Sequence, residues 1–185
     1  MQGYVGNFVG GGGIKSIQTF SDTVTTGNST KDITITSVDT TSSIIIATQD
    51  LRNAVVTYSD YVCSWQLTSS TNLRLTRNGT SGSSDTVSGF IVEFEDNVIL
   101  SNQYATVALA ASATSATQTI SSVGTGDTFI IPSGAIQTAG SYGSAQPFPS
   151  MVEVTLNSAT QIGVTCTNPQ TSLDVSYAYQ VIEKV

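Results

Sequence analysis

Histidine is absent from this 185-residue chain, and charged residues make up only 10 % of it, where about 25 % is usual for soluble domains. The most common general base and metal ligand is therefore missing. Cysteine is nearly absent too: Cys63 and Cys166 stand far apart in the sequence, so they cannot supply the clustered ligands of a zinc site. These absences argue against an enzyme, and we expect no catalytic residue, no metal site and no cofactor.

Basic clusters and long apolar runs are also lacking. Thirteen acidic residues outnumber six basic ones and give a net charge of −7, which disfavours binding to nucleic acid and to anionic membranes. No stretch of about 18 apolar residues is present that could span a bilayer. The first residues lack the basic and apolar regions of a signal peptide, so we expect synthesis in the cytoplasm without export.

The chain does contain an internal sequence repeat. Residues 67–78, LTSSTNLRLTRN, match residues 156–167, LNSATQIGVTCT, at a shift of 89 positions. At a shift of 85 the matched segments are 16–18 with 101–103, 35–38 with 120–123, and 43–46 with 128–131. The shift grows from 85 to 89 positions along the chain, so the second copy contains an insertion of four residues near 140–149. Such order-preserving self-similarity indicates one structural unit used twice.

Both copies are built from short runs of alternating apolar and polar residues, separated by turn clusters rich in Gly, Asn and Ser. The runs predict strands near 14–25, 30–38, 43–48, 54–58, 61–68, 72–77 and 86–95, and near 99–109, 117–123, 128–132, 151–156, 161–166 and 174–183. We therefore predict an all-β fold with two tandem antiparallel β-sandwich units, Ig-like or jelly-roll-like, and an extended N-terminal arm. The predicted boundaries are 1–13 for the Gly-rich arm, 14–96 for the first unit and 97–185 for the second.

The cysteines and the single tryptophan fall on the apolar phase of their predicted strands. We expect Cys63 and Cys166 to be buried free thiols rather than a disulfide. The same phase favours a core position for Trp65. Trp65 together with Tyr58 and Tyr61 would also have the composition of a sugar-stacking platform, which is the competing hypothesis.

Glu93, Glu95 and Asp96 form the densest group of carboxylates in the sequence. Two carboxylates can act together in a glycosidase, and several can bind calcium. A glycosidase, however, needs a cleft that raises the pKa of its acid, and this segment has the pattern of the exposed side of a closing strand. We interpret the three residues as solvated surface.

Three motifs occur in a fixed order along the chain: Ile14-Lys-Ser-Ile-Gln18, Ile35-Thr-Ser-Val-Asp39 and the closing Tyr179-Gln-Val-Ile-Glu183. They resemble a short β repeat of tailed-bacteriophage virion proteins, which has an Ile-Lys-Ser-Ile-Gln-like opening strand, a Ser-Val-Asp turn and a closing aromatic-Gln-Val-Val-Glu strand. The resemblance covers about residues 14–184 as two copies. The first copy closes on GFIVE at 89–93, without the Gln, and Gly124 replaces Asp39 in the second copy.

The resemblance implies a non-enzymatic structural component of the virion, either a capsid decoration or head fibre, or a tail or baseplate appendage. We expect it to contact other virion proteins, capsid or tail, and to form a homo-oligomer, for which a trimer is our prediction. The alternative hypothesis is a carbohydrate- or receptor-binding adhesin module at a fibre tip, with a host-surface glycan as ligand. An enzyme is the third hypothesis, and the residue inventory disfavours it.

Two segments are the candidate contact regions. Residues 1–13 hold six glycines and no charge, and Tyr4, Phe8 and Val9 give this arm apolar groups that can add to a partner's sheet edge or fill its pockets. The insertion at 140–149 carries Tyr142 and Phe148. Loops added to the end of a sandwich are common recognition sites, so these two aromatics are the candidate recognition loop.

Overall fold

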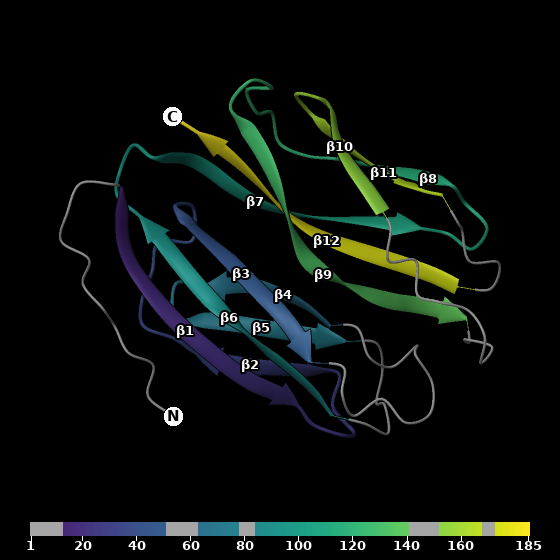
Figure 1. The fold of residues 1–185 in the computed structure, drawn as a ribbon, viewed down its shortest axis with the longest axis horizontal. Helices are drawn as coiled ribbons and strands as arrows, with labels where there is room; N and C mark the ends of the chain where they lie inside the picture. Colours follow the sequence, from purple (N-terminus) through teal and green to yellow (C-terminus); the bar gives the residue numbers. More distant parts are fainter. Residues whose placement is uncertain (1–12, 51–62, 78–83, 141–151, 168–172) are drawn as a thin grey trace.

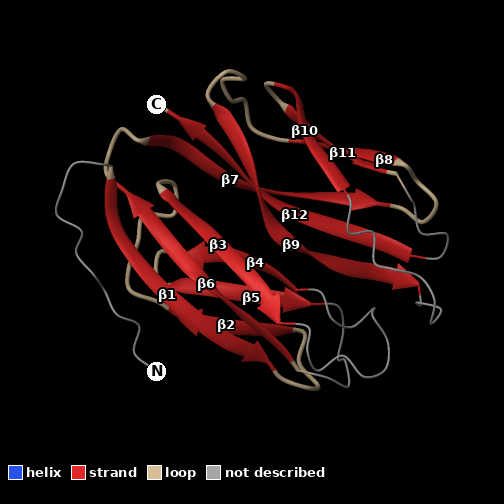
Figure 2. Cartoon of the chain, viewed as in Figure 1, coloured by secondary structure: helices blue, strands red, loops and turns tan. Residues whose placement is uncertain are grey.

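The computed structural model describes residues 13–50, 63–77, 84–140, 152–167 and 173–185, and these ranges form twelve strands and no helix (Figures 1 and 2). The strands are β1 (Ile14–Val24), β2 (Thr30–Thr34), β3 (Ser43–Asp50), β4 (Cys63–Ser69), β5 (Asn72–Arg77), β6 (Asp85–Phe94), β7 (Ile99–Leu109), β8 (Ser115–Thr119), β9 (Thr128–Gly140), β10 (Val152–Ser158), β11 (Gln161–Cys166) and β12 (Leu173–Lys184). Every pairing between them is antiparallel. The prediction of an all-β, sandwich-type fold is confirmed.

The first half of the chain, β1 to β6, consists of two three-stranded layers. One layer has the order β1-β6-β3, and the other has the order β2-β5-β4. Because side chains alternate between the faces of a strand, each layer turns one apolar row inward. The inward rows form a core of Phe20, Val24, Val38, Ile45, Cys63, Trp65, Leu67, Leu73, Leu75, Val87 and Ile91.

The second half, β7 to β12, has the same strand order. Its layers are β7-β12-β9 and β8-β11-β10. The register is also the same: Glu93 of β6 lies opposite Ser16 of β1, and Glu183 of β12 lies opposite Ser101 of β7. The core of this half is built from Ala105, Val107, Leu109, Ile120, Val123, Ala135, Ile162, Val164, Cys166, Val175, Tyr177, Tyr179 and Val181.

The two halves meet where the edge of β3 lies against β12, with the first half at the lower left of Figure 1 and the second at the upper right. The side chain of Gln180, which is 0 % exposed, accepts a hydrogen bond from Ile45 N at 2.8 Å and donates one to Ile45 O at 2.7 Å. Its amide thus takes the place that a neighbouring strand would have at this sheet edge. Asn102 adds a bond from its Nδ2 to Ser43 O.

An apolar cluster and one close backbone contact complete this junction. The cluster contains Ile44, Val92, Ile99 and Ile182, with Ile17, Phe94, Val98 and Ile131 packed around it. On the other side, β4 meets β9 at Ser64 and Gly134, which joins two three-stranded layers into one six-stranded sheet. Gly134 has a φ of 88°, and a Cβ there would overlap the carbonyl of Cys63. Only glycine fits this crossing.

Three predicted strands have clearly wrong bounds. The strand predicted to end at Pro132 continues to Gly140, because Pro132 sits opposite a register shift in β12 between Tyr177 and Tyr179. A proline at such an irregularity removes no regular ladder bond.

The strand predicted over 30–38 ends at Thr34. Beyond that point, the N–H groups of Ile35 and Val38 bond the carbonyls of Thr71 and Ser70 in the β4–β5 turn. The strand predicted over 117–123 is also displaced, since β8 spans Ser115–Thr119. The strand predicted at 54–58 lies outside the described residues.

The predicted positions of the cysteines and of Trp65 are confirmed. Cys63 and Cys166 are both free and buried, and Trp65 belongs to the first core. Burial, with the nearby Asp85 carboxylate, raises the pKa of the Cys63 thiol to about 12. The thiol therefore stays protonated and unreactive at neutral pH.

Candidate functional site

The residues assigned from sequence to the arm and to the recognition loop are Tyr4, Phe8, Val9, Tyr142 and Phe148. All five lie outside the described residues. Within the described ranges, no three His, Cys, Asp or Glu side chains come together as a metal site. The same ranges contain no helix that is long and apolar enough to cross a membrane.

The carboxylate of Glu93 is the centre of a buried polar cluster in the first half. Glu93 is only 4 % exposed, and it accepts hydrogen bonds from Lys15 Nζ at 2.9 Å, Ser16 Oγ at 3.0 Å and Asp39 N at 3.0 Å. Gln18 bonds both the N–H and the carbonyl of Thr36. These contacts fasten the segment between β2 and β3 to the ends of β1 and β6.

The interpretation of this carboxylate as solvated surface was therefore wrong for Glu93. The phase of β6 runs through Asp85, Val87 and Ile91 to Glu93, all of which face inward. Glu95, beyond the strand, is exposed as expected, and so is Asp96.

The second half has an equivalent cluster, in which Glu183, Ser101 and Gln103 correspond to Glu93, Ser16 and Gln18. Glu183 accepts hydrogen bonds from Ser101 Oγ at 3.3 Å and Gly124 N at 2.6 Å. Gln103 bonds both the N–H and the carbonyl of Ser121, as Gln18 does with Thr36. In both copies, a glutamate and a glutamine thus fasten the equivalent connecting segment to the same two strand ends.

The electrostatics of Glu93 suit a structural role. Burial alone would raise the pKa of Glu93, but the hydrogen bonds from Asp39 N, Lys15 and Ser16 outweigh it and hold the pKa below its usual value. A glycosidase acid needs the opposite shift. A carboxylate whose acceptors are occupied by three protein donors is placed to hold strands together, and it has no free face for a substrate.

A buried ion pair occupies the other end of the first sandwich. Arg77 Nη1 lies 2.7 Å from Asp85 Oδ2, and their side chains are 0 % and 1 % exposed. Arg77 also donates to the carbonyls of Asn28 and Thr25. The second half has Cys166 at the position of Arg77, because Arg77 faces Cys63 as Cys166 faces Val152. At the described positions of the second half that correspond to Arg77 and Asp85, Cys166 and Val175 cannot form an ion pair, so this pair serves the fold of one half.

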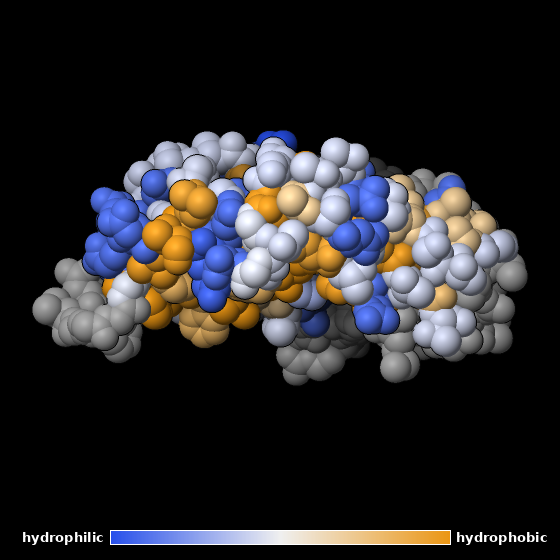
Figure 3. Space-filling model, turned by 90° about the horizontal axis from the view of Figure 1, so that it is seen from above, coloured by the Kyte–Doolittle hydropathy of each residue, from blue (hydrophilic) through white to orange (hydrophobic). Residues whose placement is uncertain are grey.

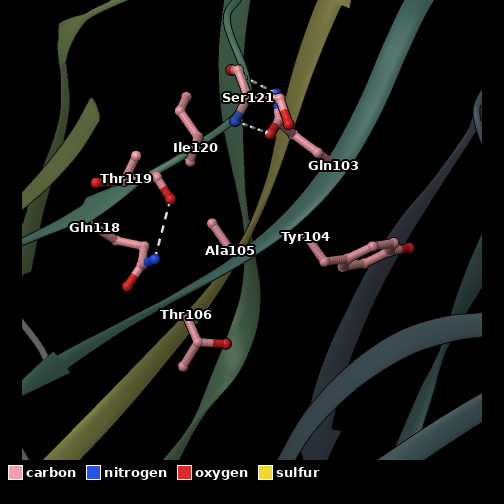
Figure 4. Close-up of a pocket in the computed structure, with 8 residues that line it drawn as sticks. All are labelled: Gln103, Tyr104, Ala105, Thr106, Gln118, Thr119, Ile120 and Ser121. Atoms are coloured by element: carbon pink, nitrogen blue, oxygen red, sulfur yellow. Dashed lines mark hydrogen bonds between the residues drawn. The ribbon is translucent and has the colours of Figure 1, made fainter. Parts of the chain in front are cut away.

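A polar groove runs between the open edges of β7 and β8 in the second half (Figure 4). Its volume is about 620 Å³, and it is lined by Gln103, Tyr104, Ala105, Thr106, Gln118, Thr119, Ile120 and Ser121. Gln103 and Ser121 close one side through their two hydrogen bonds, while the Tyr104 ring points away from the groove (Figure 4). Amide and hydroxyl groups without charge can bind the hydroxyls of a sugar.

An exposed apolar pair stands on the outer face of the first half. Ile46 of β3 lies opposite Phe90 of β6, and each side chain is 49 % exposed. The next row along the same face, Ile44 with Val92, is covered by the second half. Apolar side chains reach the surface of the molecule among hydrophilic ones in Figure 3. Ile46 and Phe90 thus continue the apolar surface of the junction onto the exposed face of the first half.

Sequence reasoning missed Gln180 and the Ile46–Phe90 pair as residues of interest. A signal was present for the pair: the runs Ile44-Ile-Ile46 and Phe90-Ile-Val92 are apolar on both phases. A strand with two apolar faces has to be covered on both sides. Gln180 gave no such signal, since its partner Ile45 is 135 positions away.

A scan against protein-family models, a search of the curated proteins and a search of the solved structures each found no match for this chain.

Proposed function

We propose that this chain is a non-enzymatic structural component of a tailed-bacteriophage virion, made of two tandem sandwich units. The observation that carries the proposal is the strand-end cluster. In the first half, the opening motif at 14–18, the turn motif at 35–39 and the closing segment GFIVE at 89–93 are far apart in sequence, yet hydrogen bonds of Ser16, Gln18, Asp39 and Glu93 bring them together. Their counterparts do the same in the second half.

The polar residues of the motifs therefore hold strands together, which supports a structural role. A module of this kind acts by contacting neighbouring subunits through the faces and edges of its β-sheets. The low charge of the chain and the exposed Ile46 and Phe90 support such a role, because apolar rows on a sheet face are typical of subunit contacts. In this proposal the chain docks on capsid or tail proteins through residues 1–13 and forms a homo-oligomer, with a trimer as the expected state.

Mass spectrometry of gradient-purified particles from the phage that encodes the chain tests this proposal. The expected result is a fixed stoichiometry relative to the major capsid or tail protein, retained after a salt wash. Separating heads from tails before the measurement assigns the location. Finding the chain only in the soluble fraction of the lysate contradicts the proposal.

The docking role of the arm needs a separate experiment. A variant lacking residues 1–12 should keep the far-UV circular dichroism of the full chain but fail to join particles in a complementation assay. A second variant replaces Tyr4 and Phe8 by Ser in the full-length chain. It should show the same loss of incorporation if these two aromatic side chains make the contact. Normal incorporation of both variants would exclude the arm as the docking element.

A glycan-binding adhesin is the second candidate, favoured by the uncharged groove between β7 and β8. A glycan array with the full chain would then show binding that Gln118→Ala or Thr106→Ala weakens. Tyr142→Ala and Phe148→Ala test the recognition loop in the same assay. The absence of binding to every glycan on the array would count against this function and leave the structural role as it stands.

A further inference from the structure

The two halves use equivalent surfaces differently. The matching registers make Phe90 of β6 the counterpart of Gln180 of β12, because Phe90 faces Ile46 and Thr19 as Gln180 faces Ile131 and Tyr104. Gln180 is buried under the edge of a neighbouring sandwich, which is the first half of the same chain. Phe90 is 49 % exposed. One of two equivalent positions is therefore covered by a sandwich edge, and the other is open.

The edge that covers Gln180 also has an open counterpart. That edge is β3 around Ile44 and Ile45, and the same registers place Phe129 and Ile130 of β9 at these positions. Phe129 is 39 % exposed. In the described part of the chain, β9 pairs with β4 at Gly134 alone, so its stretch around Phe129 has no hydrogen-bonded strand on that side.

We propose that a second copy of this chain covers Phe90 and Ile46, and that it does so with the β9 edge around Phe129. In this contact the β9 edge would be used as the β3 edge is used within one chain, and it would cover Phe90 and Ile46, because Val92 in the next row is already buried against Ile182. It joins two different surfaces, so it is heterologous and can close into a ring. The inference rests on the proposed oligomeric role and specifies the surfaces that the oligomer uses.

The chemistry of the two surfaces fits this contact. Phe90, Ile46 and Phe129 are apolar, whereas the buried Gln180 has a hydrogen-bonding role toward Ile45 that a phenylalanine cannot fill. An aromatic pair at the centre of a contact is the type of residue that dominates interface energies. The contact also continues the apolar cluster around Val92 and Ile182, which already joins two sandwiches.

Cysteine cross-linking of the full chain tests the proposal. Cys63 and Cys166 are buried, so an exposed cysteine introduced at one surface position is the reactive one. Phe90→Cys protein mixed with Phe129→Cys protein should form a disulfide-linked dimer under mild oxidation, and neither variant alone should do so to the same extent. Gln66→Cys, exposed on the opposite layer of the first half, replaces Phe90→Cys in the control mixture.

Light scattering after size exclusion supplies the second measurement. Phe90→Gln, which introduces the residue of the equivalent position, should keep the fold and weaken self-association about tenfold or more, as expected for an aromatic anchor. The proposal is overturned if the native chain is monomeric at high micromolar concentration, or if Phe90→Cys alone cross-links as well as the mixture. A monomeric chain that is still present in particles would overturn this inference and leave the proposed function intact.

Discussion

The two sandwiches of this chain share their strand order, their register and the glutamate that ties their strand ends together, yet they differ in what lies inside. The first half holds a buried Arg77–Asp85 ion pair, while the second has Cys166 and Val175 at the corresponding positions. The strand order, the register and the strand-end glutamate are therefore the features that the two sandwiches have in common. The ion pair is an alternative way to fill one end of the same sandwich, so one half can be tested by giving it the residues of the other.

The largest expected effect comes from breaking the ion pair. Asp85→Val leaves the Arg77 guanidinium buried without its carboxylate, which should lower the free energy of unfolding by about 3–5 kcal/mol. The double variant Arg77→Cys with Asp85→Val gives the first half the residues of the second, and it should be far closer to the native chain. Urea unfolding of the three proteins measures the difference. A double variant as unstable as the single one would show that the two ends are not interchangeable.

The junction should give the next largest effect. Gln180→Leu removes both hydrogen-bond partners of the buried Ile45 backbone, and because each orphaned group costs about 1–3 kcal/mol, we expect a loss of about 2 kcal/mol or more. The control is Gln118→Leu on the exposed strand β8, where the change should stay within about 0.5 kcal/mol. Thermal and urea unfolding report both. Equal small effects would mean that the β3 edge does not depend on Gln180.

A glycine comparison tests the second junction contact. Gly134→Ala should destabilise the chain by about 1–3 kcal/mol, because the residue has a positive φ and its Cβ would strike the Cys63 carbonyl. Gly126→Ala meets nothing within 4 Å and has no positive φ, so it should be neutral. If both substitutions were neutral, β4 and β9 would not be in contact at Gly134.

The smallest effect concerns pH. The folded-state pKa of Glu93 is below its usual value, so its contribution to stability is complete above the usual carboxyl pKa, about 4.3. The contribution is lost as the pH falls through the lower folded value. Glu93→Gln should therefore flatten the stability profile in the acid range, and Lys15→Met should flatten it in part. An unchanged acid limb in Glu93→Gln would contradict the assigned hydrogen bonds.

The sequence was sufficient to predict the class of fold and most strands, because alternating apolar residues and Gly-rich turns report on local structure. It also placed Cys63, Cys166 and Trp65 in the core, since each lies on the apolar phase of its strand. Glu93 lies on the same inward phase as Val87 and Ile91, but its hydrogen-bond partners could not be predicted in this way. Its donors come from β1 and from the segment after β2, and only the folded sandwich brings them to the end of β6.

The junction was beyond sequence reasoning for the same physical reason. Gln180 is one polar residue in an apolar strand, and nothing near it in the chain shows that it caps the edge of β3. The exposed Phe90 and Ile46 were within reach, because both belong to runs that are apolar on two phases. The residues assigned to docking and recognition, 1–13 with Tyr142 and Phe148, remain predictions that the particle and glycan experiments address.

The β3 edge, bound by Gln180, locks the two sandwiches into a single body. Equilibrium unfolding of the full chain tests this directly, because the single tryptophan, Trp65, reports on the first half while far-UV circular dichroism reports on both. If this edge joins the two sandwiches, the two signals change together in one transition, and they separate in Gln180→Leu. Two separate transitions in the native chain would contradict it.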